Sequence, residues 1–164
     1  TKEHPAKNVP KPKKPAGADE KSLKGLHLSI AFAVAATQYA YNTGDYSLLE
    51  QSSMSEPERN YFLREEKERL DKTREGTFWP DNITIEYTLT EESPRLEGDG
   101  EYKWDREFIV EYGKFEVVDG KVEYHSDEDH DMIYRDKFIG NLTAQYINGA
   151  WITSAVAIQP KSKS

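Results

Sequence analysis

The chain has 164 residues, of which 36% are hydrophobic and 32% are charged, and it contains no cysteine. A length of this order predicts a single domain. The formal net charge of -8 at pH 7 argues against nucleic acid as a partner, because phosphate binding needs a basic protein face. The lack of cysteine excludes disulfides, thiolate metal sites and cysteine nucleophiles.

Residues 1–21 differ in composition from the rest of the chain. They hold four prolines and six lysines, and their three acidic residues leave a net charge of +3, so residues 22–164 carry -11. We predict an extended tether here, followed by one domain over residues 22–159 and a polar tail over 160–164. The tether's lysines Lys11, Lys13 and Lys14 are its predicted partner-binding residues.

A long helix is predicted to follow the tether from Ser22. Apolar and small residues recur at steps of three and four along one helical stripe: Leu23, Leu26, Ile30, Ala33, Thr37 and Tyr41. The apolar run is too short and too polar for a membrane-spanning helix, so we expect a buried helix with no transmembrane segment. Gly44 is expected to end this helix.

Two further helices are predicted before residue 76. Asp45 is placed to cap a short helix that begins at Tyr46. Ser55 and Glu58 form a capping-box pattern, in which each side chain would bond the other residue's backbone N–H, ahead of a helix over residues 56–75. Its thin apolar face, which includes Tyr61 and Phe62, indicates a helix on the surface.

After Gly76 the hydrophobic period changes from helical spacing to alternation, which is typical of strands. Asp119-Gly120 and Asn148-Gly149 are signals for two-residue hairpins. The first predicts Val117 opposite Val122 and Phe115 opposite Tyr124; the second predicts Tyr146 opposite Trp151 and Leu142 opposite Ala155. The expected fold class is therefore α+β, with helices followed by a curved, mostly antiparallel sheet wrapped around the first helix.

Arg106 interrupts an apolar strand face that runs from Tyr102 to Tyr112. A cation there needs a carboxylate, a ring face or a ligand, so Arg106 is either a paired structural arginine or an anchor for an anion. With Tyr39, Tyr41 and Trp104 it forms the set of predicted pocket-lining residues. Asp45 lies near tyrosines and is compatible with either proton transfer or the helix cap already assigned to it.

The stretch "EYHSDEDHDMIY" at residues 123–134 is the strongest metal-like pattern in the chain. Asp127, Asp129 and Asp131 fit the start of a calcium loop, but Met132 and Phe138 replace the glycine and glutamate that such a loop requires. His125, Asp127, Asp129 and His130 are thus weak metal candidates. We expect a solvated loop between strands, and no cofactor or catalytic residue is predicted.

Residues 35–62, "AATQYAYNTGDYSLLEQSSMSEPERNYF", resemble the "NYA..TGD...L..LS" segment of a family of actinobacterial lipoproteins of unknown function. That family's domain is similar to the nuclear transport factor 2-like (cystatin-like) cone. Its paired cysteines after the Thr-Gly-Asp are absent here. The resemblance implies a location in the cell envelope, a lipid anchor ahead of a spacer such as residues 1–21, and the outer face of the cytoplasmic membrane.

Two functions are compatible with these features. The first is a non-catalytic, envelope-tethered interaction domain, such as an accessory lipoprotein subunit of a membrane-bound respiratory complex, with a protein partner. The second is a small-molecule binding protein, or an isomerase-like or cyclase-like enzyme, that uses the interior of the cone. The cone fold alone does not decide between them.

Overall fold

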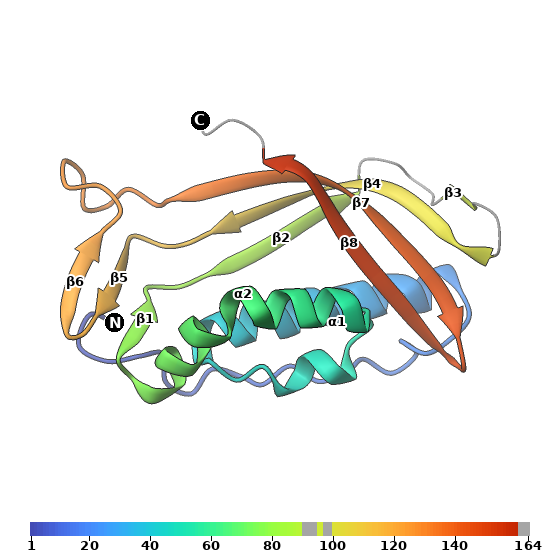
Figure 1. Cartoon of the computed structure of the whole chain (residues 1–164), viewed down its shortest axis with the longest axis horizontal. Coiled ribbons are helices and arrows are strands. Elements are labelled where there is room, and N and C mark those ends of the chain that lie inside the picture. Colours follow the sequence, from blue (N-terminus) through green and yellow to red (C-terminus); the bar gives the residue numbers. More distant parts are fainter. Residues whose placement is uncertain (90–94, 97–99, 161–164) are drawn as a thin grey trace.

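The computed structural model describes residues 1–89, 95–96 and 100–160, and it has two long helices followed by a curled antiparallel sheet. The sheet forms a half-barrel that arches over the helices (Figure 1). The predicted α+β class and the order of helices before strands are therefore correct. The helical elements are α1 (Leu23–Thr43), the 3-10 helix η1 (Ser47–Gln51) and α2 (Glu56–Glu75).

The strands form two separate sheets. The larger has the order β2-β4-β7-β8, with β3 paired to β4, and the smaller has the order β1-β5-β6. Every strand pair within these sheets is antiparallel. Their bounds are β1 Phe78–Pro80, β2 Thr84–Leu89, β3 Arg95–Leu96, β4 Tyr102–Glu111, β5 Phe115–Val118, β6 Lys121–Tyr124, β7 Arg135–Ile147 and β8 Ala150–Pro160.

Both predicted hairpins have the expected register. Val117 pairs with Val122 and Phe115 with Tyr124 across β5 and β6. Tyr146 pairs with Trp151 and Leu142 with Ala155 across β7 and β8. Asp119 and Asn148 have φ values of 50° and 52°, and each is followed by a glycine with φ of 81°, as a type I′ turn requires.

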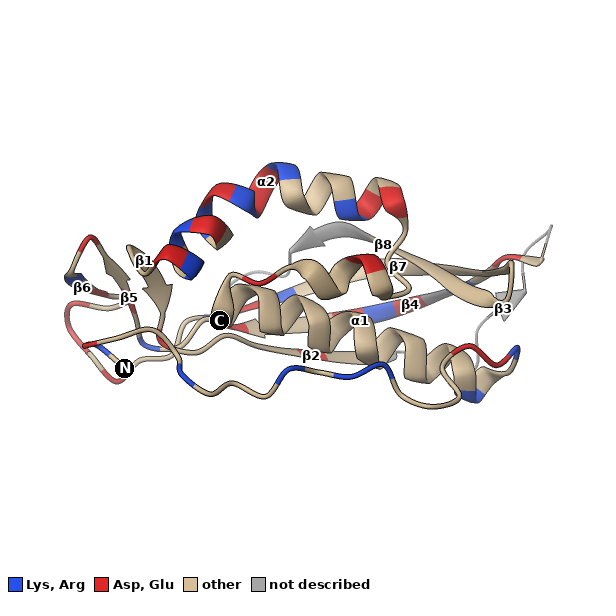
Figure 2. Ribbon diagram, turned by 90° about the horizontal axis from the view of Figure 1, so that it is seen from below, with Lys and Arg blue, Asp and Glu red and all other residues tan. Residues whose placement is uncertain are grey.

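Helix α1 packs beneath the sheet between α2 and the N-terminal arm (Figure 2). It begins at Ser22, whose side chain accepts the Gly25 N–H, and ends at Gly44 with φ of 79°. A Cβ on Gly44 would lie 2.3 Å from the Leu70 carbonyl oxygen, so only glycine allows α1 to approach α2 this closely. No helix in the described residues is both long and apolar enough to cross a membrane, as expected.

The core divides into two clusters on α1 and a third under the small sheet. One side of α1 packs Leu26 and Ile30 against Leu142 and Trp151 of the large sheet. The other side packs Phe32 and Ala36 against η1 and α2. The predicted apolar face of α2 is wrong at Tyr61, which is 59% exposed and stacks with Arg64 instead, because the helix turns Phe62 and Leu70 inward.

Hydrogen bonds from groups outside the large sheet lie at its two edges, from side chains at β2 and from the backbone at β8. At β2, Asn42 accepts the Ile83 N–H and donates to the Ile83 carbonyl, both at 2.8 Å, and Gln38 accepts the Ile85 N–H. At β8, the Thr153 N–H bonds the Ser53 carbonyl. These contacts replace the neighbouring strand that an edge lacks.

The capping box at the start of α2 forms only in part. The Ser55 side chain accepts the Glu58 N–H at 3.4 Å, as predicted. The reciprocal bond is absent because the Ser55 N–H bonds the Thr153 carbonyl, and the Glu58 carboxylate accepts the Ala155 N–H of β8 at 2.9 Å. Glu58 thus joins α2 to the sheet and points toward the interior.

The N-terminal arm, residues 1–21, lies along its own domain (Figure 2). Buried or half-buried side chains donate to its backbone carbonyls at both ends. Trp79 bonds the Thr1 carbonyl at 2.7 Å, Ser29 bonds the Ala18 carbonyl at 2.7 Å, and Trp151 bonds the Glu20 carbonyl at 2.8 Å. The arm is therefore held against the body at both of its ends.

Candidate functional site

Arg106 lies in the middle of β4, a strand flanked by β2 and β7. Only 1% of the residue is exposed, although it is a charged side chain in the largest sheet. Its Nε and Nη1 atoms are buried and have no hydrogen-bond partner among the described residues. Buried guanidinium groups are rare unless they are paired, so these two unsatisfied donors mark an unusual position.

The Arg106 guanidinium packs on the ring of Phe108, with 3.1 Å between its carbon and the ring centroid. Both residues lie on one face of β4 because side chains two apart in a strand point the same way. Burial lowers the pKa of Arg106 to about 10, and the nearby Glu58 and Tyr87 oppose that shift. The group therefore remains a cation at neutral pH in a poorly solvated position.

Glu58 faces Arg106 from the first turn of α2. Burial raises the pKa of Glu58, while the Ala155 N–H bond and the charge of Arg106 lower it. No ion pair within bonding distance joins Glu58 to Arg106 in the described part of the chain, and the Glu58 carboxylate accepts the Ala155 N–H instead. Glu58 thus gives Arg106 a nearby opposite charge without satisfying its donors.

A second group of titratable side chains lies two turns further along α2. Glu66 shares the inner face of the helix with Glu58 and Phe62, because residues four apart lie above one another. Burial raises the pKa of Glu66 and of Tyr41, and the charge of Glu66 adds to the effect on Tyr41. Burial also raises the pKa of Tyr112 to about 12.

We call these two groups together the interior strip: Tyr41, Glu58, Glu66, Tyr87, Arg106 and Tyr112. Its members come from α1, α2, β2, β4 and the residue that follows β4. Tyr41 contacts Phe62 edge-to-face, with 5.5 Å between the ring centroids. The strip offers one unsatisfied cation, two protonatable carboxylates and three tyrosines to the inside of the half-barrel.

The predicted pocket residues do not all share one place. Arg106 and Tyr41 both belong to the interior strip, Arg106 in the group with Glu58 and Tyr41 in the group with Glu66. Tyr39 packs instead with Phe32, Leu48 and Leu49 on the side of α1 that faces η1. The backbone of Trp104 lies in β4, but its side chain is outside the described residues.

Sequence reasoning missed Glu58, Glu66, Tyr87 and Tyr112. Acids on a highly charged helix indicate a solvated face. The sequence pattern assigns Glu58 to a capping box and places the whole helix on the surface. Glu66 does follow Glu58 by eight residues with Phe62 midway, which is the one periodic signal that they share a face with an apolar residue.

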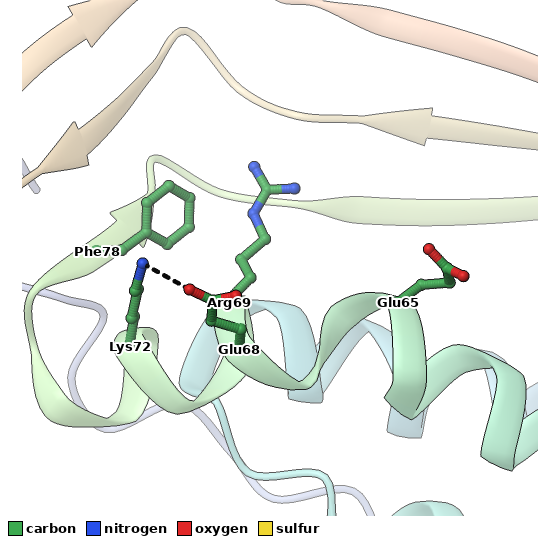
Figure 3. Close-up of a pocket in the computed structure, with 5 residues that line it drawn as sticks. All are labelled: Glu65, Glu68, Arg69, Lys72 and Phe78. Carbon is green, nitrogen blue, oxygen red and sulfur yellow. Dashed lines mark ion pairs between the residues drawn. The ribbon is translucent and has the colours of Figure 1, made fainter.

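Two hollows occur elsewhere on the molecule. The larger, of about 610 Å³, lies at the start of α1 beside the β7–β8 turn, and its lining includes Lys21, Leu26, Tyr102 and Trp151. The smaller, of about 280 Å³, lies between α2 and Phe78 (Figure 3). Its charged residues are already paired: Lys72 with Glu68 at 3.2 Å, and Arg69 with Glu116.

The loop that joins β6 to β7 has its own internal contacts. His130 stacks on Tyr124 with 3.6 Å between ring centroids, and the Asp131 N–H bonds the Asp129 carboxylate. Lys114 pairs with Asp131 at 3.3 Å. Within residues 1–89, 95–96 and 100–160, no three His, Asp or Glu side chains come together as a metal-binding group.

Two of the three lysines singled out in the arm have partners within the chain. Lys11 pairs with Asp45 at 3.7 Å, and Lys14 pairs with Asp19 at 2.7 Å. Asp45 also accepts the Ser47 N–H at the start of η1, but the N-cap residue is Tyr46, so the predicted cap at Asp45 is displaced by one residue. The hydrogen bond to Ser47 is the main cause of the lowered pKa of Asp45, and Lys11 contributes.

Comparison with known proteins gives one match, to a family model. Neither the curated proteins nor the solved structures contain a match to this chain. The matched model is described as a family of unknown function, and it covers residues 1–157, which include the arm as well as the half-barrel. The chain belongs to this family of unknown function, DUF6318.

Proposed function

We propose that the protein is a non-catalytic, envelope-tethered binding domain whose half-barrel holds a carboxylate-bearing small molecule against Arg106. The observation that carries the proposal is the burial of the Arg106 guanidinium with Nε and Nη1 unpartnered among the described residues. A carboxylate oxygen would satisfy these donors and offset the cost of the buried charge.

A singly charged carboxylate suits this position better than a phosphate. Glu58 already places negative charge near Arg106, and a second charge on the ligand would raise the cost of removing it from water. Phe108 supplies an apolar surface beside the guanidinium, which favours a ligand with a ring or short chain next to its carboxylate.

Binding is favoured over catalysis at Arg106 because its nearest acid has a structural task. The Glu58 carboxylate accepts the Ala155 N–H and so fixes the edge of β8 to α2. A group held in this way is suited to maintaining the shape of the site.

The envelope part of the proposal rests on the resemblance of residues 35–62 to actinobacterial lipoproteins with a nuclear transport factor 2-like cone. The half-barrel of helices beneath a curled sheet is compatible with such a cone. The Thr1 end of the arm lies against Trp79 of the small sheet, so an anchor on that side would place the small sheet nearest the membrane. Lys13 is exposed and is the arm lysine we assign to a protein partner, such as a membrane-bound respiratory assembly.

The binding proposal is tested with benzoate as the probe and benzamide as its uncharged counterpart. We expect benzoate to raise the melting temperature of the full chain, benzamide to have no effect, and Arg106→Met to abolish the response to benzoate. Lys103→Met is the matched control, because it removes a half-buried cation on the opposite face of the same strand. An equal response of the wild type and Arg106→Met to benzoate would overturn the proposal.

A second candidate function is favoured by the Glu66 group. A carboxyl with a raised pKa beside two tyrosines is an arrangement that proton-transfer enzymes use, as in an isomerase. In that case Glu66 would act as the acid or base, and Tyr41 and Tyr112 would stabilise an oxyanion. Proton exchange from a ketone probe into deuterated water, lost in Glu66→Gln and retained in Glu65→Gln, would support this function over simple binding.

A further inference from the structure

The hollow at the start of α1 is separate from the interior strip. Tyr102 lines it and Arg106 does not, and four residues of a strand span about 13 Å. Its volume of about 610 Å³ lies within the range of about 300–1,000 Å³ that small-molecule pockets occupy. The benzoate proposal does not involve it.

The floor and walls of this hollow are apolar and fixed in place. Leu26 and Trp151 are 1% and 5% exposed, and Trp151 contacts Tyr102 and Tyr146 edge-to-face. The polar atoms of two of these rings are used by the arm: the Trp151 N–H bonds the Glu20 carbonyl and the Tyr146 O–H bonds the Asp19 carbonyl. Since these donors are satisfied, the two rings can contribute apolar surface to the hollow.

The rim combines exposed apolar side chains with a cation. Leu23 and Ile147 line the hollow and are 46% and 45% exposed, which is costly for aliphatic side chains in water. Lys21 also lines it, with its Nζ 5.9 Å from the centre of the Tyr146 ring, and no carboxylate pairs with Lys21 in the described part of the chain. The nearby Asp19 is already paired with Lys14.

From this arrangement we infer that the hollow binds a small carboxylate with an apolar tail. The tail would lie on Leu26 and Trp151 between the rim residues Leu23 and Ile147, and the carboxylate would lie near Lys21. The charge of Lys21 selects a carboxylate over an amine, and the apolar floor selects an aliphatic tail over a polar one. This is a second binding site, distinct in position and ligand shape from the one at Arg106.

The test titrates the full chain with octanoate, octanol and octylamine. Binding is monitored by the NMR signal of the Trp151 indole N–H. Octanoate is expected to shift the Trp151 signal and to bind about fivefold more tightly than octanol, because an exposed charge pair contributes up to about 1 kcal/mol. Octylamine is expected to bind more weakly than octanol. Lys21→Gln should remove the preference for octanoate, whereas Lys7→Gln, at another exposed lysine of the same arm, should keep it.

A second variant tests the apolar part of the site without disturbing the core. Ile147→Glu is expected to weaken octanoate binding about tenfold or more, since it removes rim surface and adds a repelling charge. Ile133→Glu is the matched control at an equally exposed isoleucine outside the hollow, and it should bind as the wild type does. Arg106→Met should also leave octanoate binding unchanged.

Three results would overturn the inference. The first is equal binding of octanoate and octanol to the wild type, which would exclude a role for Lys21. The second is wild-type octanoate binding by Ile147→Glu, which would place the probe elsewhere. The third is loss of octanoate binding in Arg106→Met while Lys21→Gln and Ile147→Glu still bind it. That result would assign the probe to the interior strip and leave this hollow without a ligand.

Discussion

Replacement of Arg106 by methionine should stabilise the unliganded protein, although it removes a buried side chain from a central strand. Replacing a buried ion pair by apolar residues of similar volume is neutral or gains up to about 4 kcal/mol, and we expect the same sign for Arg106 because two of its donors are unsatisfied among the described residues. The loss of the guanidinium contact with Phe108 costs about 0.5–2 kcal/mol. We therefore expect a net gain of about 1–2 kcal/mol in the free energy of unfolding, because two donors of Arg106 have no partner to lose among the described residues.

Urea unfolding at pH 7 measures this change. With a denaturant dependence of about 2 kcal/mol per molar urea, the midpoint should rise by about 0.5–1 M. Glu58→Gln provides an internal check, because glutamine keeps an oxygen that can accept the Ala155 N–H. In the wild-type background Glu58→Gln should lower stability, because it removes the charge opposite Arg106. In the Arg106→Met background it should raise stability, because it removes a glutamate charge that has no opposite charge left.

A fall in stability would refute this reasoning. Breaking a satisfied buried ion pair costs about 3–5 kcal/mol. If Arg106→Met lowered the urea midpoint by that amount, Arg106 would have a structural partner within the folded chain. The proposal that it awaits a ligand would then fail.

Three further predictions concern other parts of the fold. Gly25→Ala should destabilise the protein and expose the arm to proteolysis, because the new Cβ would lie 2.1 Å from the Glu20 carbonyl oxygen. This clash should outweigh the gain of about 1 kcal/mol that alanine gives within a helix. Higher stability of the variant in urea would contradict this contact. Asn42→Ala should lower the free energy of unfolding in urea by about 2–4 kcal/mol, because both backbone groups of Ile83 lose their partner. A loss below about 1 kcal/mol would mean that water replaces the amide. Burial raises the pKa of Glu66 in the folded state, so the native state binds more protons than the unfolded state and the wild type loses stability as the pH rises above 4.5, the ordinary glutamate pKa. Glu66→Gln should reduce this loss. Identical pH profiles of the melting temperature for the two proteins would contradict this effect.

The parts of the fold that depend on local chemistry could be predicted from the sequence. The Asp-Gly and Asn-Gly turns set the registers of both hairpins, because two adjacent residues with positive φ leave one way to pair the flanking strands. The end of α1 at Gly44 follows from the same kind of local rule, and so does the bond from the Ser47 N–H to the Asp45 carboxylate at the start of η1, although the N-cap itself is Tyr46.

The contacts that build the site depend on pairs far apart in the chain. Glu58 was assigned to a local cap and instead bonds Ala155, 97 residues away. The hydrogen bonds that hold the arm are accepted by its backbone carbonyls, which every residue has, so the side-chain pattern of residues 1–21 carries no signal of these bonds. Arg106 was recognised as unusual because one charge in an apolar alternation is visible locally, whereas its lack of a partner is a property of the packed interior.

We propose that the Arg106 guanidinium is free to bind a carboxylate inside the half-barrel. Its Nε–H signal in an NMR spectrum tests this directly, and the signal is identified by its disappearance in Arg106→Lys. We expect benzoate to shift this signal in a saturable way and to slow its exchange with water, and we expect benzamide to leave it unchanged. A signal that stays in place at saturating benzoate, with exchange already slow in the free protein, would show that Arg106 is satisfied within the chain and that it does not bind a ligand.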